Sequence, residues 1–510
     1  MRRMKGAAGL LTALLLAFQL SAQTFALANE DNGIKVVPVN FTHNGYSYEI
    51  EGVAKSTDGD YQIKSPARLA ARKLPSTYDP RSSGEITTVK DQASTGACWA
   101  FSALACAEQD LIKKGLENPS TEFSVPALVL SSNSGTATGK DDFSSGGNWL
   151  FAASALANGQ GLCYEDYEPF LESGTENMIV SENKKSVSEY RLNYVMELSS
   201  TTQVKRKIME LGAVSASYFA GNGYMNHNNT AYYDPVTVVG WDDNYSKDNF
   251  RYKPANNGAW LVKGSWGADQ DNDGFYWVSY DEAEFGQFCC YDFEESCDNT
   301  YHYSKMTGYV VNASNDGSVY GANVFTAKAD EKLDKAGFMY VGKTGSADYT
   351  LSVYTNVSDS DPIGVLETQI SGSVSANGFY TVDFPEDILI EEGEKYSISV
   401  KFSGDSGRGY LLAESDRTSK AQSGQSYVSL NGKYWSDVGA DKTDSIGSLF
   451  IYAYTDDTAK PDKSSLETTL GKYGTLAGCE REANNARTVL ADETASKNDI
   501  SNAQKLLISA

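Results

Sequence analysis

Histidine is nearly absent from this chain: its 510 residues contain three, His43, His227 and His302. Imidazole is the usual general base near neutral pH and the commonest protein ligand of transition metals, so either kind of chemistry has few residues to use. The cysteines at 289–297 have no histidine or second thiol pair at the spacing of metal ligands. The sequence therefore predicts no metal site and no cofactor.

Positive charge is also in short supply. Lysine and arginine total 43 against 67 aspartate and glutamate residues, and the formal net charge is −24. Binding to a phosphate backbone or to anionic lipid needs clustered basic side chains. The charge balance argues against a nucleic-acid partner and indicates a soluble, self-repelling acidic surface.

Long apolar runs are missing after the N-terminal stretch MRRMKGAAGLLTALLLAFQLSAQTFALA. That stretch has a basic start, an apolar centre interrupted by Thr12 and Gln19, and small residues at Ala26 and Ala28. These features are typical of a secretory signal peptide, and the apolar run is short for a membrane span of about 20 residues. We therefore expect residues 1–28 to be removed and the mature protein to be secreted, extracellular or cell-envelope associated, with no membrane span. A retained anchor is the alternative.

Cysteine occurs seven times, and an odd number leaves at least one thiol outside any intramolecular disulfide. Cys98 and Cys106 lie on one predicted helix, separated by a rise of about 12 Å, which is too far for a disulfide. In CCYDFEESC, Cys297 is a candidate partner for Cys289 or Cys290. The sequence leaves this pairing open.

Four stretches of different texture follow the signal. Residues 29–74 are polar and predict an N-terminal arm or short pro-segment. Over 75–300, helical and strand patterns mix. Over 301–456, period-two strands recur between Gly, Asp and Ser turns, which is typical of a β-sandwich. Residues 457–510 start as a polar linker and continue as short helices. The fold class predicted is α+β, with a mixed domain, an all-β sandwich and a short helical module.

Cys98 lies at the predicted start of a helix, a position that favours a nucleophilic thiolate. CWAFSALACAEQDLIKKG predicts a helix that begins near Cys98 and stops at Gly115. A helix N-terminus lowers a thiol pKa because the dipole and the unbonded N–H groups favour the thiolate. Gln92, upstream of the helix, is placed to donate an amide hydrogen to an oxyanion beside the sulfur. Cys98 is therefore the candidate nucleophile.

The stretch YDPRSSGEITTVKDQASTGACWAFSA resembles the active-site segment of the papain-like cysteine peptidase family. The resemblance continues in SSGGNWLF, VTVVGWDDNY and GAWLVKGSWGADQDNDGFYWVSY. It implies a two-lobe papain-like fold for the mixed domain, with Cys98 as nucleophile and Gln92 as oxyanion glutamine. It also implies that Gly146 and Gly147 lie along the substrate and that Trp266 covers the catalytic corner beside it.

Two departures from that family pattern bear on activity. Asp234 stands where the family has its catalytic histidine, and Gly264 stands where it has the orienting asparagine. A carboxylate beside Cys98 disfavours the thiolate, and an aspartate of ordinary pKa near 4 is a poor acid for a leaving amine at neutral pH. His227 precedes Asp234 in the same loop and is a candidate replacement base, with a solvated loop histidine as the alternative.

Residues 301–456 resemble the lectin-like domain that follows papain-like domains in some secreted bacterial proteins. Tyr434 and Trp435 are candidates to stack on a sugar or to pack in a hairpin. Residues 457–510 resemble a helical module of bacterial cell-wall proteins. Three functional hypotheses follow. The first is a catalytically inactive or impaired peptidase homologue that binds peptide or glycan at the cell surface. The second is an active cysteine endopeptidase that uses a rearranged base such as His227. The third is a carbohydrate-binding adhesin that acts through the β-sandwich.

Overall fold

The computed structural model describes residues 39–43, 46–50, 73–132, 143, 146–167, 169–170, 189–218, 234–269, 273–282, 285–304, 310–358, 360–415, 421–440, 446–458, 463–492, 495 and 497–509. The predicted signal peptide and most of the predicted arm lie outside these residues. Within the arm, β1 (Val39–His43) and β2 (Tyr46–Ile50) pair as an antiparallel hairpin.

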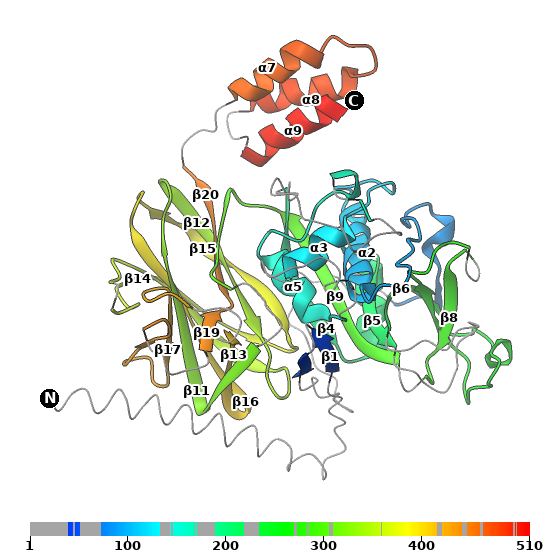
Figure 1. Ribbon diagram of the computed structural model, residues 1–510, viewed down its shortest axis with the longest axis horizontal. Helices are drawn as coiled ribbons and strands as arrows, with labels where there is room; N and C mark the ends of the chain where they lie inside the picture. The colour runs from blue at the N-terminus through cyan, green and yellow to red at the C-terminus, as the bar shows by residue number, and fades with distance from the viewer. Residues whose placement is uncertain are drawn as a thin grey trace.

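The first domain combines a helical part with a sheet, and Figure 1 shows α2, α3 and α5 gathered beside β9. Its helices are α2 (Cys98–Lys113), α3 (Val125–Ser132), α5 (Trp149–Ala157) and α6 (Thr201–Leu211), with single turns of 3-10 helix at Pro80–Ser82, Glu165–Tyr167 and Lys247–Asn249. The helix predicted after Cys98 is confirmed as α2. It is rich in Ala and Leu, which favour helix, and Gly115 follows it with a φ of +74°.

The strands of the first domain supply the second wall of the candidate site. They are β3 (Thr77–Tyr78), β4 (Tyr190–Leu198), β5 (Val214–Tyr218), β6 (Asp234–Asp242), β7 (Ala259–Lys263), β8 (Phe275–Ser279), β9 (Phe285–Glu295) and β10 (Asn299–Tyr301). The segments PVTVVGW, GAWLVKGSW and GFYWVSY, rich in β-branched and aromatic residues, contain β6, β7 and β8. These three pair antiparallel in chain order.

The β-rich region folds as a sandwich, which confirms that prediction. Its strands are β11 (Val310–Thr326), β12 (Glu331–Tyr340), β13 (Ala347–Thr355), β14 (Val365–Val374), β15 (Gly378–Ile390), β16 (Lys395–Ser415), β17 (Ser426–Ser429), β18 (Ser436–Asp437), β19 (Ile446–Leu449) and β20 (Ile451–Asp457). One sheet has the order β14-β13-β16-β11-β17-β18, with β19 on β16. Phe338 of β12 and Phe402 of β16 meet edge to face across the core, with ring centroids 5.3 Å apart.

The other sheet of the sandwich continues into the first domain. Its strand order is β10-β20-β12-β15-β4-β9-β5-β6-β7-β8, and β3 joins at β6. At the junction, β15 pairs antiparallel with β4, and Gly378 lies opposite Met196. A Cβ at Gly378 would lie 2.0 Å from the Val195 carbonyl oxygen, so this approach requires glycine. One hydrophobic cluster spans the junction and includes Phe151 of α5 and Phe379 of β15. The two domains therefore share both a sheet and a core.

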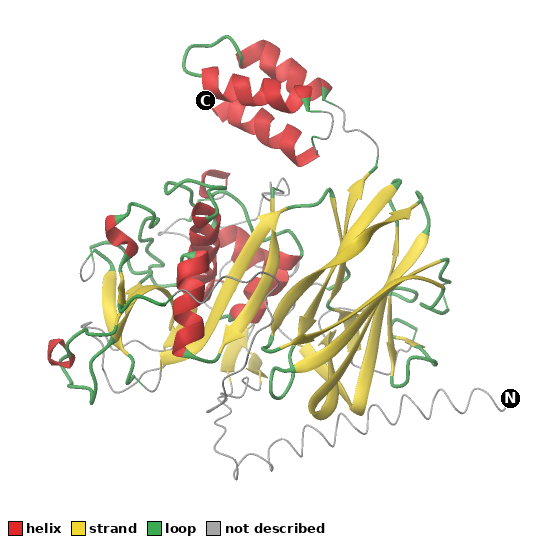
Figure 2. Ribbon diagram, turned by 180° about the vertical axis from the view of Figure 1, so that it is seen from behind, coloured by secondary structure: helices red, strands yellow, loops and turns green. Residues whose placement is uncertain are grey.

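The C-terminal residues form a three-helix bundle that Figure 2 shows apart from the rest of the chain. It consists of α7 (Ser464–Tyr473), α8 (Glu480–Ala491) and α9 (Lys497–Ser509), as the apolar periodicity predicted. The bundle has its own apolar core, which includes Leu466 and Leu507. Lys505 Nζ lies 2.6 Å from Glu189 Oε1, which ties the bundle to the first domain. Among helices in the described ranges, none has the length and apolar character needed to span a bilayer.

Candidate active site

Cys98 is the first residue of α2 and lies on the first wall of the candidate site. Its side chain is 6% exposed, and Sγ lies 3.8 Å from the Gly96 carbonyl oxygen. The Gly96 N–H donates to the Phe143 carbonyl at 2.6 Å and so fixes the turn before the helix. Ala97 occupies the N-cap without a side-chain hydrogen bond, so no N-cap side chain accepts from the first N–H groups of α2. The helix terminus therefore favours a thiolate at Cys98.

Gln92 connects the segment before α2 to the segment after β7. Its backbone N–H donates to the Ser265 carbonyl at 2.7 Å, and the Ser265 hydroxyl donates to Gln92 Oε1. The Gln92 Nε2 donates to the Thr95 carbonyl at 3.1 Å. An isolated bridge between Asp91 and Trp266 extends this connection. The structure thus brings Gln92 and Cys98 to the same junction as the residues after β7.

The second wall comes from β6 and β7. Asp234 is the first residue of β6 and pairs with Tyr218 of β5, but its side chain lies outside what the structure describes. Gly264 follows β7 directly and is buried. Thr237 pairs with Lys263, so positions 234 and 264 belong to neighbouring strands.

Neither space nor backbone strain requires glycine at position 264. A Cβ there would meet its nearest heavy atoms, in Gly274 and Tyr276, at 3.4 Å, which is ordinary van der Waals contact. Its φ lies outside the left-handed region. Trp266 covers this corner and stacks on Tyr276 with ring centroids 6.2 Å apart. The packing around position 264 therefore has room for a Cβ.

The two walls are joined behind the site. The Ser102 hydroxyl lies 2.8 Å from the Val236 carbonyl oxygen, which links α2 to β6. A cavity of about 20 Å³ lies beside this link, and its lining includes Ser102, Pro235, Lys263 and Gly264. That volume holds about one water molecule.

The glycine pair packs on the residue after Cys98. A Cβ at Gly147 would lie 2.4 Å from the Trp99 indole, so the ring occupies the space of a side chain there. Gly146 is exposed and Gly147 half-buried. Asn148 then caps α5 by accepting from the Leu150 N–H at 2.9 Å. The predicted substrate-lining segment therefore lies against the first turn of α2.

A buried charge network lies under the second wall, and the sequence analysis did not single it out. Lys263 Nζ donates to the Thr87 hydroxyl at 2.8 Å, and Thr87 donates to Glu108 Oε2 at 2.9 Å. Glu108 Oε1 accepts from Lys90 Nζ at 3.3 Å. Burial lowers the pKa of Lys263 to about 8, and the Glu108 charge opposes that shift. The signal in the sequence was the acidic pair Glu108 and Asp110 inside an otherwise apolar helix.

The three histidines occupy different settings. His227 lies outside the described residues, so the structure neither places nor removes it as a base. His302 lies in the connection to the sandwich, with Nδ1 3.0 Å from the Ser304 carbonyl oxygen and its ring stacked on Tyr452. His43 is the last residue of β1.

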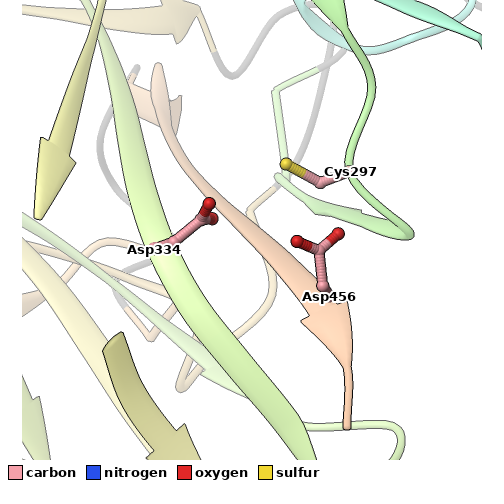
Figure 3. A group of neighbouring side chains, drawn as sticks. All are labelled: Cys297, Asp334 and Asp456. Carbon is pink, nitrogen blue, oxygen red and sulfur yellow. The ribbon is translucent and has the colours of Figure 1, made fainter. Parts of the chain in front are cut away.

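A second group of polar side chains lies where the two domains meet. Figure 3 shows Cys297, Asp334 and Asp456 converging, and their ligand atoms all lie within 4.8 Å of one another. Asp334 is the extra residue of a bulge in β12, and Asp456 accepts from the Asp298 N–H at 3.0 Å. The sequence analysis missed this group because its members come from distant strands. No disulfide joins any of the seven cysteines, all of which lie in the described ranges.

The charged side chains around Cys297, Asp334 and Asp456 favour a network of ion pairs over a bound metal ion. Burial raises the pKa of Cys297 to about 12 against the influence of Arg191. Arg191 is 3% exposed, pairs with Glu294 and lies over the Tyr454 ring at 4.4 Å. A thiol and two carboxylates suit a divalent cation. Here, however, the Arg191 guanidinium already supplies positive charge close to them.

The class of protein follows from these features and from comparison with known families. Residues 74–315 match the family model described as papain family cysteine protease, and residues 300–455 match the model described as lectin like domain. The chain therefore carries a papain-family cysteine protease domain followed by a lectin-like domain. The resemblance and the fold class inferred from the sequence are confirmed.

Among solved structures, two of Cwp84 are similar to this chain. One is a clostridial cysteine protease Cwp84 after propeptide cleavage, at 26% identity and a TM-score of 0.64, covering 75% of this chain and 99% of that chain. The other contains the cysteine protease and lectin-like domains of Cwp84, a surface layer associated protein of Clostridium difficile. It has 26% identity and a TM-score of 0.63, and covers 76% of this chain and 90% of that one.

Two curated relatives each match about two fifths of this chain. Falcipain-3 of Plasmodium falciparum is 26% identical over 224 residues, which are 42% of this chain and 42% of the relative. Procathepsin L of Felis catus is 27% identical over 223 residues, which are 41% of this chain and 62% of the relative. The chain thus spans less than two thirds of the length of either relative.

Proposed function

We propose that the papain-like domain binds peptides in its cleft and hydrolyses them poorly or not at all. The observation that carries this proposal is Gly264, a buried glycine at the orienter position whose added Cβ would meet no atom closer than 3.4 Å. Asp234 also stands at the family's histidine position, so neither position carries the residue type that acts as base or as its orienter in that family.

The chemistry of the substituted positions supports this proposal. A papain-like nucleophile is a thiolate held by an imidazolium, and a carboxylate in its place raises the thiol pKa instead of lowering it. The helix terminus still favours an anion beside Cys98, and the Gln92 side chain, which donates one hydrogen bond to the Thr95 carbonyl, lies just upstream of it. Neither of them moves a proton to a leaving amine.

The architecture supports a place outside the cell. The N-terminal 28 residues have the features of a signal peptide, and Cwp84, which has the same two domains, is a surface layer associated protein. We assign residues 29–74 to an arm or pro-segment, 75–300 to the papain-like domain, 301–456 to the lectin-like domain and 457–510 to the linker and bundle. A structure of Cwp84 after propeptide cleavage is consistent with a pro-segment in this architecture.

A second candidate function is carbohydrate binding by the lectin-like domain. Tyr434 is 70% exposed at the tip of a turn that the Asn431 side chain holds by accepting from the Tyr434 N–H at 3.1 Å. An exposed aromatic ring on a fixed turn is a platform on which a sugar ring stacks. Trp435 packs edge to face on Tyr320, with ring centroids 6.4 Å apart, and so belongs to the support of this turn.

The test uses the full-length secreted chain and its Cys98→Ala variant. Binding of a fluorescent peptide panel is measured by anisotropy, and hydrolysis of the same sequences is followed with a fluorogenic label. We expect binding by both proteins and no hydrolysis that depends on Cys98. Cys98-dependent turnover would show an active peptidase. Peptide binding by neither protein, together with glycan binding that a Tyr434→Ala change abolishes, would favour the adhesin.

A further inference from the structure

The lectin-like domain reaches the papain-like cleft through one hydrogen-bonded bridge. Asn377, which directly precedes β15, is 1% exposed. Its Nδ2 donates to Glu197 Oε2 of β4 at 3.2 Å, and its carbonyl accepts from the Glu197 N–H at 3.0 Å. Its Oδ1 accepts from the Gly342 N–H at 2.8 Å, so the amide is held on both sides. Asn377 therefore fixes the Glu197 carboxylate from the lectin-like side of the junction.

Glu197 passes this constraint to the start of α5. Its carboxylate also accepts a hydrogen bond from the Trp149 side chain. Trp149 is the first residue of α5 and follows Asn148, the N-cap, directly. The bridge thus runs from the lectin-like domain through Glu197 to the residue next to the helix cap.

The start of α5 is also the end of the glycine segment. Gly146 and Gly147 precede Asn148, and the Trp99 ring fills the space beside Gly147. Because Trp99 follows Cys98 directly, a shift of α5 along its axis would move the glycine segment relative to the thiol. The location of Gly146 and Gly147 relative to Cys98 therefore depends on the location of α5.

The other end of α5 is tied to the same side of the molecule. The Asn158 Nδ2 donates to the carbonyl of Ser304, in the connection to the lectin-like domain, at 3.1 Å. Between these two ends, Leu150 and Phe151 share a hydrophobic cluster with Phe379 of β15. The helix that borders the cleft is thus anchored at both ends and along its length toward the lectin-like domain (Figure 1).

We propose that Asn377 and Glu197 are positioning residues through which the lectin-like domain holds the Gly146–Gly147 wall of the cleft in its peptide-binding position. The effect on peptide binding rests on the proposed function. The coupling between the lectin-like domain and the Gly146–Gly147 wall does not. The lectin-like domain is then part of the peptide site, whatever else it binds.

The variants are made in the full-length chain. Glu197→Gln keeps the size of the side chain and removes its charge, and Asn377→Ala removes the link to the lectin-like side. Thr381→Val is the matched control, because Thr381 donates to Asn193 across the same β15–β4 junction without a described contact to α5. A general loosening of the junction would therefore affect all three variants alike.

Hydrogen exchange measures the coupling directly. The Leu150 and Phe151 amides, both bonded to the Asn148 side chain, report on the first turn of α5. We expect both to exchange about tenfold faster in Glu197→Gln and Asn377→Ala, which matches the loss of one buried hydrogen bond, and unchanged in Thr381→Val. Unchanged exchange in the first two variants, or equal acceleration in all three, would overturn the proposal.

Alkylation of Cys98 measures the consequence for peptide binding. Iodoacetamide reports the intrinsic reactivity of the thiol, and an epoxysuccinyl peptide reports the cleft as well. We expect the rate with the epoxysuccinyl peptide, divided by the rate with iodoacetamide, to fall about tenfold in Glu197→Gln and Asn377→Ala. The iodoacetamide rate itself should be unchanged. The Leu150 and Phe151 amides could exchange faster in the two variants while the wild-type protein reacts no faster with the peptide reagent than with iodoacetamide. That result would support the coupling and contradict the proposed peptide-binding function.

Discussion

The two walls of the cleft differ in what they retain. On the α2 wall, Cys98 begins the helix, Gln92 is fixed by Ser265, and Gly147 packs on Trp99. On the β6–β7 wall the strands pair as expected, but Asp234 and Gly264 occupy the positions of the base and its orienter. The backbone frame is present on both sides, and we propose that the proton-transfer groups are missing from the β6–β7 wall.

The comparison indicates that the shape of the binding site depends on α2 and the glycine segment, whereas proton transfer depends on side chains at β6 and after β7. The shape of the α2 wall depends on close packing, which a single added methyl group at Gly147 would disturb. On the β wall, a Cβ at Gly264 would meet no atom closer than 3.4 Å, so close packing does not select glycine there. A papain-like domain can therefore keep its fold and cleft without the catalytic groups.

The largest effect is expected from restoring the β wall. In the Asp234→His, Gly264→Asn double variant, Cys98-dependent peptide hydrolysis should rise by about 10²–10⁴-fold, the usual contribution of a positioned acid–base group. Hydrolysis of a fluorogenic peptide at neutral pH is the measurement, and the same double variant with Cys98→Ala is its control. No gain would mean that positions 234 and 264 are not aligned with the thiol.

Two glycine substitutions compare the walls directly. Gly147→Ala places a Cβ 2.4 Å from the Trp99 ring, and overpacking of that kind typically costs about 1–3 kcal/mol. Gly264→Ala meets its nearest atoms at 3.4 Å and should cost clearly less stability than Gly147→Ala, because that distance is ordinary van der Waals contact. Urea unfolding of the two variants checks the difference. Equal destabilisation would show that glycine at 264 is a packing requirement and not a chemical substitution.

A smaller effect concerns pH and the support of the α2 wall. Burial raises the pKa of Glu197 from 4.5 to about 7, while hydrogen bonds from Asn377 and Trp149 oppose the shift. The titratable groups coupled to it are Tyr380 and Cys289. Between about pH 4.5 and 7 the folded state therefore binds more protons than the unfolded state, so the free energy of unfolding falls as pH rises through this window.

The Glu197→Gln variant should lack that part of the pH dependence. We expect its stability difference between about pH 5 and 7.5 to be smaller than that of the wild type by about 1 kcal/mol, since partial exposure to solvent reduces the shift. Urea titrations at the two pH values give the comparison. A wild-type curve that is parallel to the variant's curve would contradict the raised pKa.

The α2 wall was predictable because its signals are local. A cysteine at a helix start, a glutamine upstream and a glycine pair are read from short stretches. In the structure, Gln92 and Cys98 contact the turn before α2. Gly147 packs on Trp99 in the first turn of that helix. The strands after residue 301 were predictable for the same reason, since period-two alternation is a local property.

The junction between the domains was not predictable from local patterns. Pairing of β15 with β4 joins residues far apart in the sequence, and no pattern in GFYTVDF indicates which strand it pairs with. Gly378 reads as a turn glycine, although its role is to let two backbones approach. Glu197 and Asp334 read as surface acids for the same reason: their partners come from the other domain.

The pH dependence of Cys98 alkylation tests the central claim most directly. Intact-mass measurement after reaction with iodoacetamide, with Cys98→Ala subtracting the other thiols, gives the rate from about pH 5 to 9. A thiol without an imidazolium partner should react about tenfold faster for each pH unit across the neutral range, because only its thiolate form is alkylated. A rate that is already high and flat at about pH 5–6 would reveal a thiolate paired with a cationic base, and would contradict a cleft that lacks its catalytic partners.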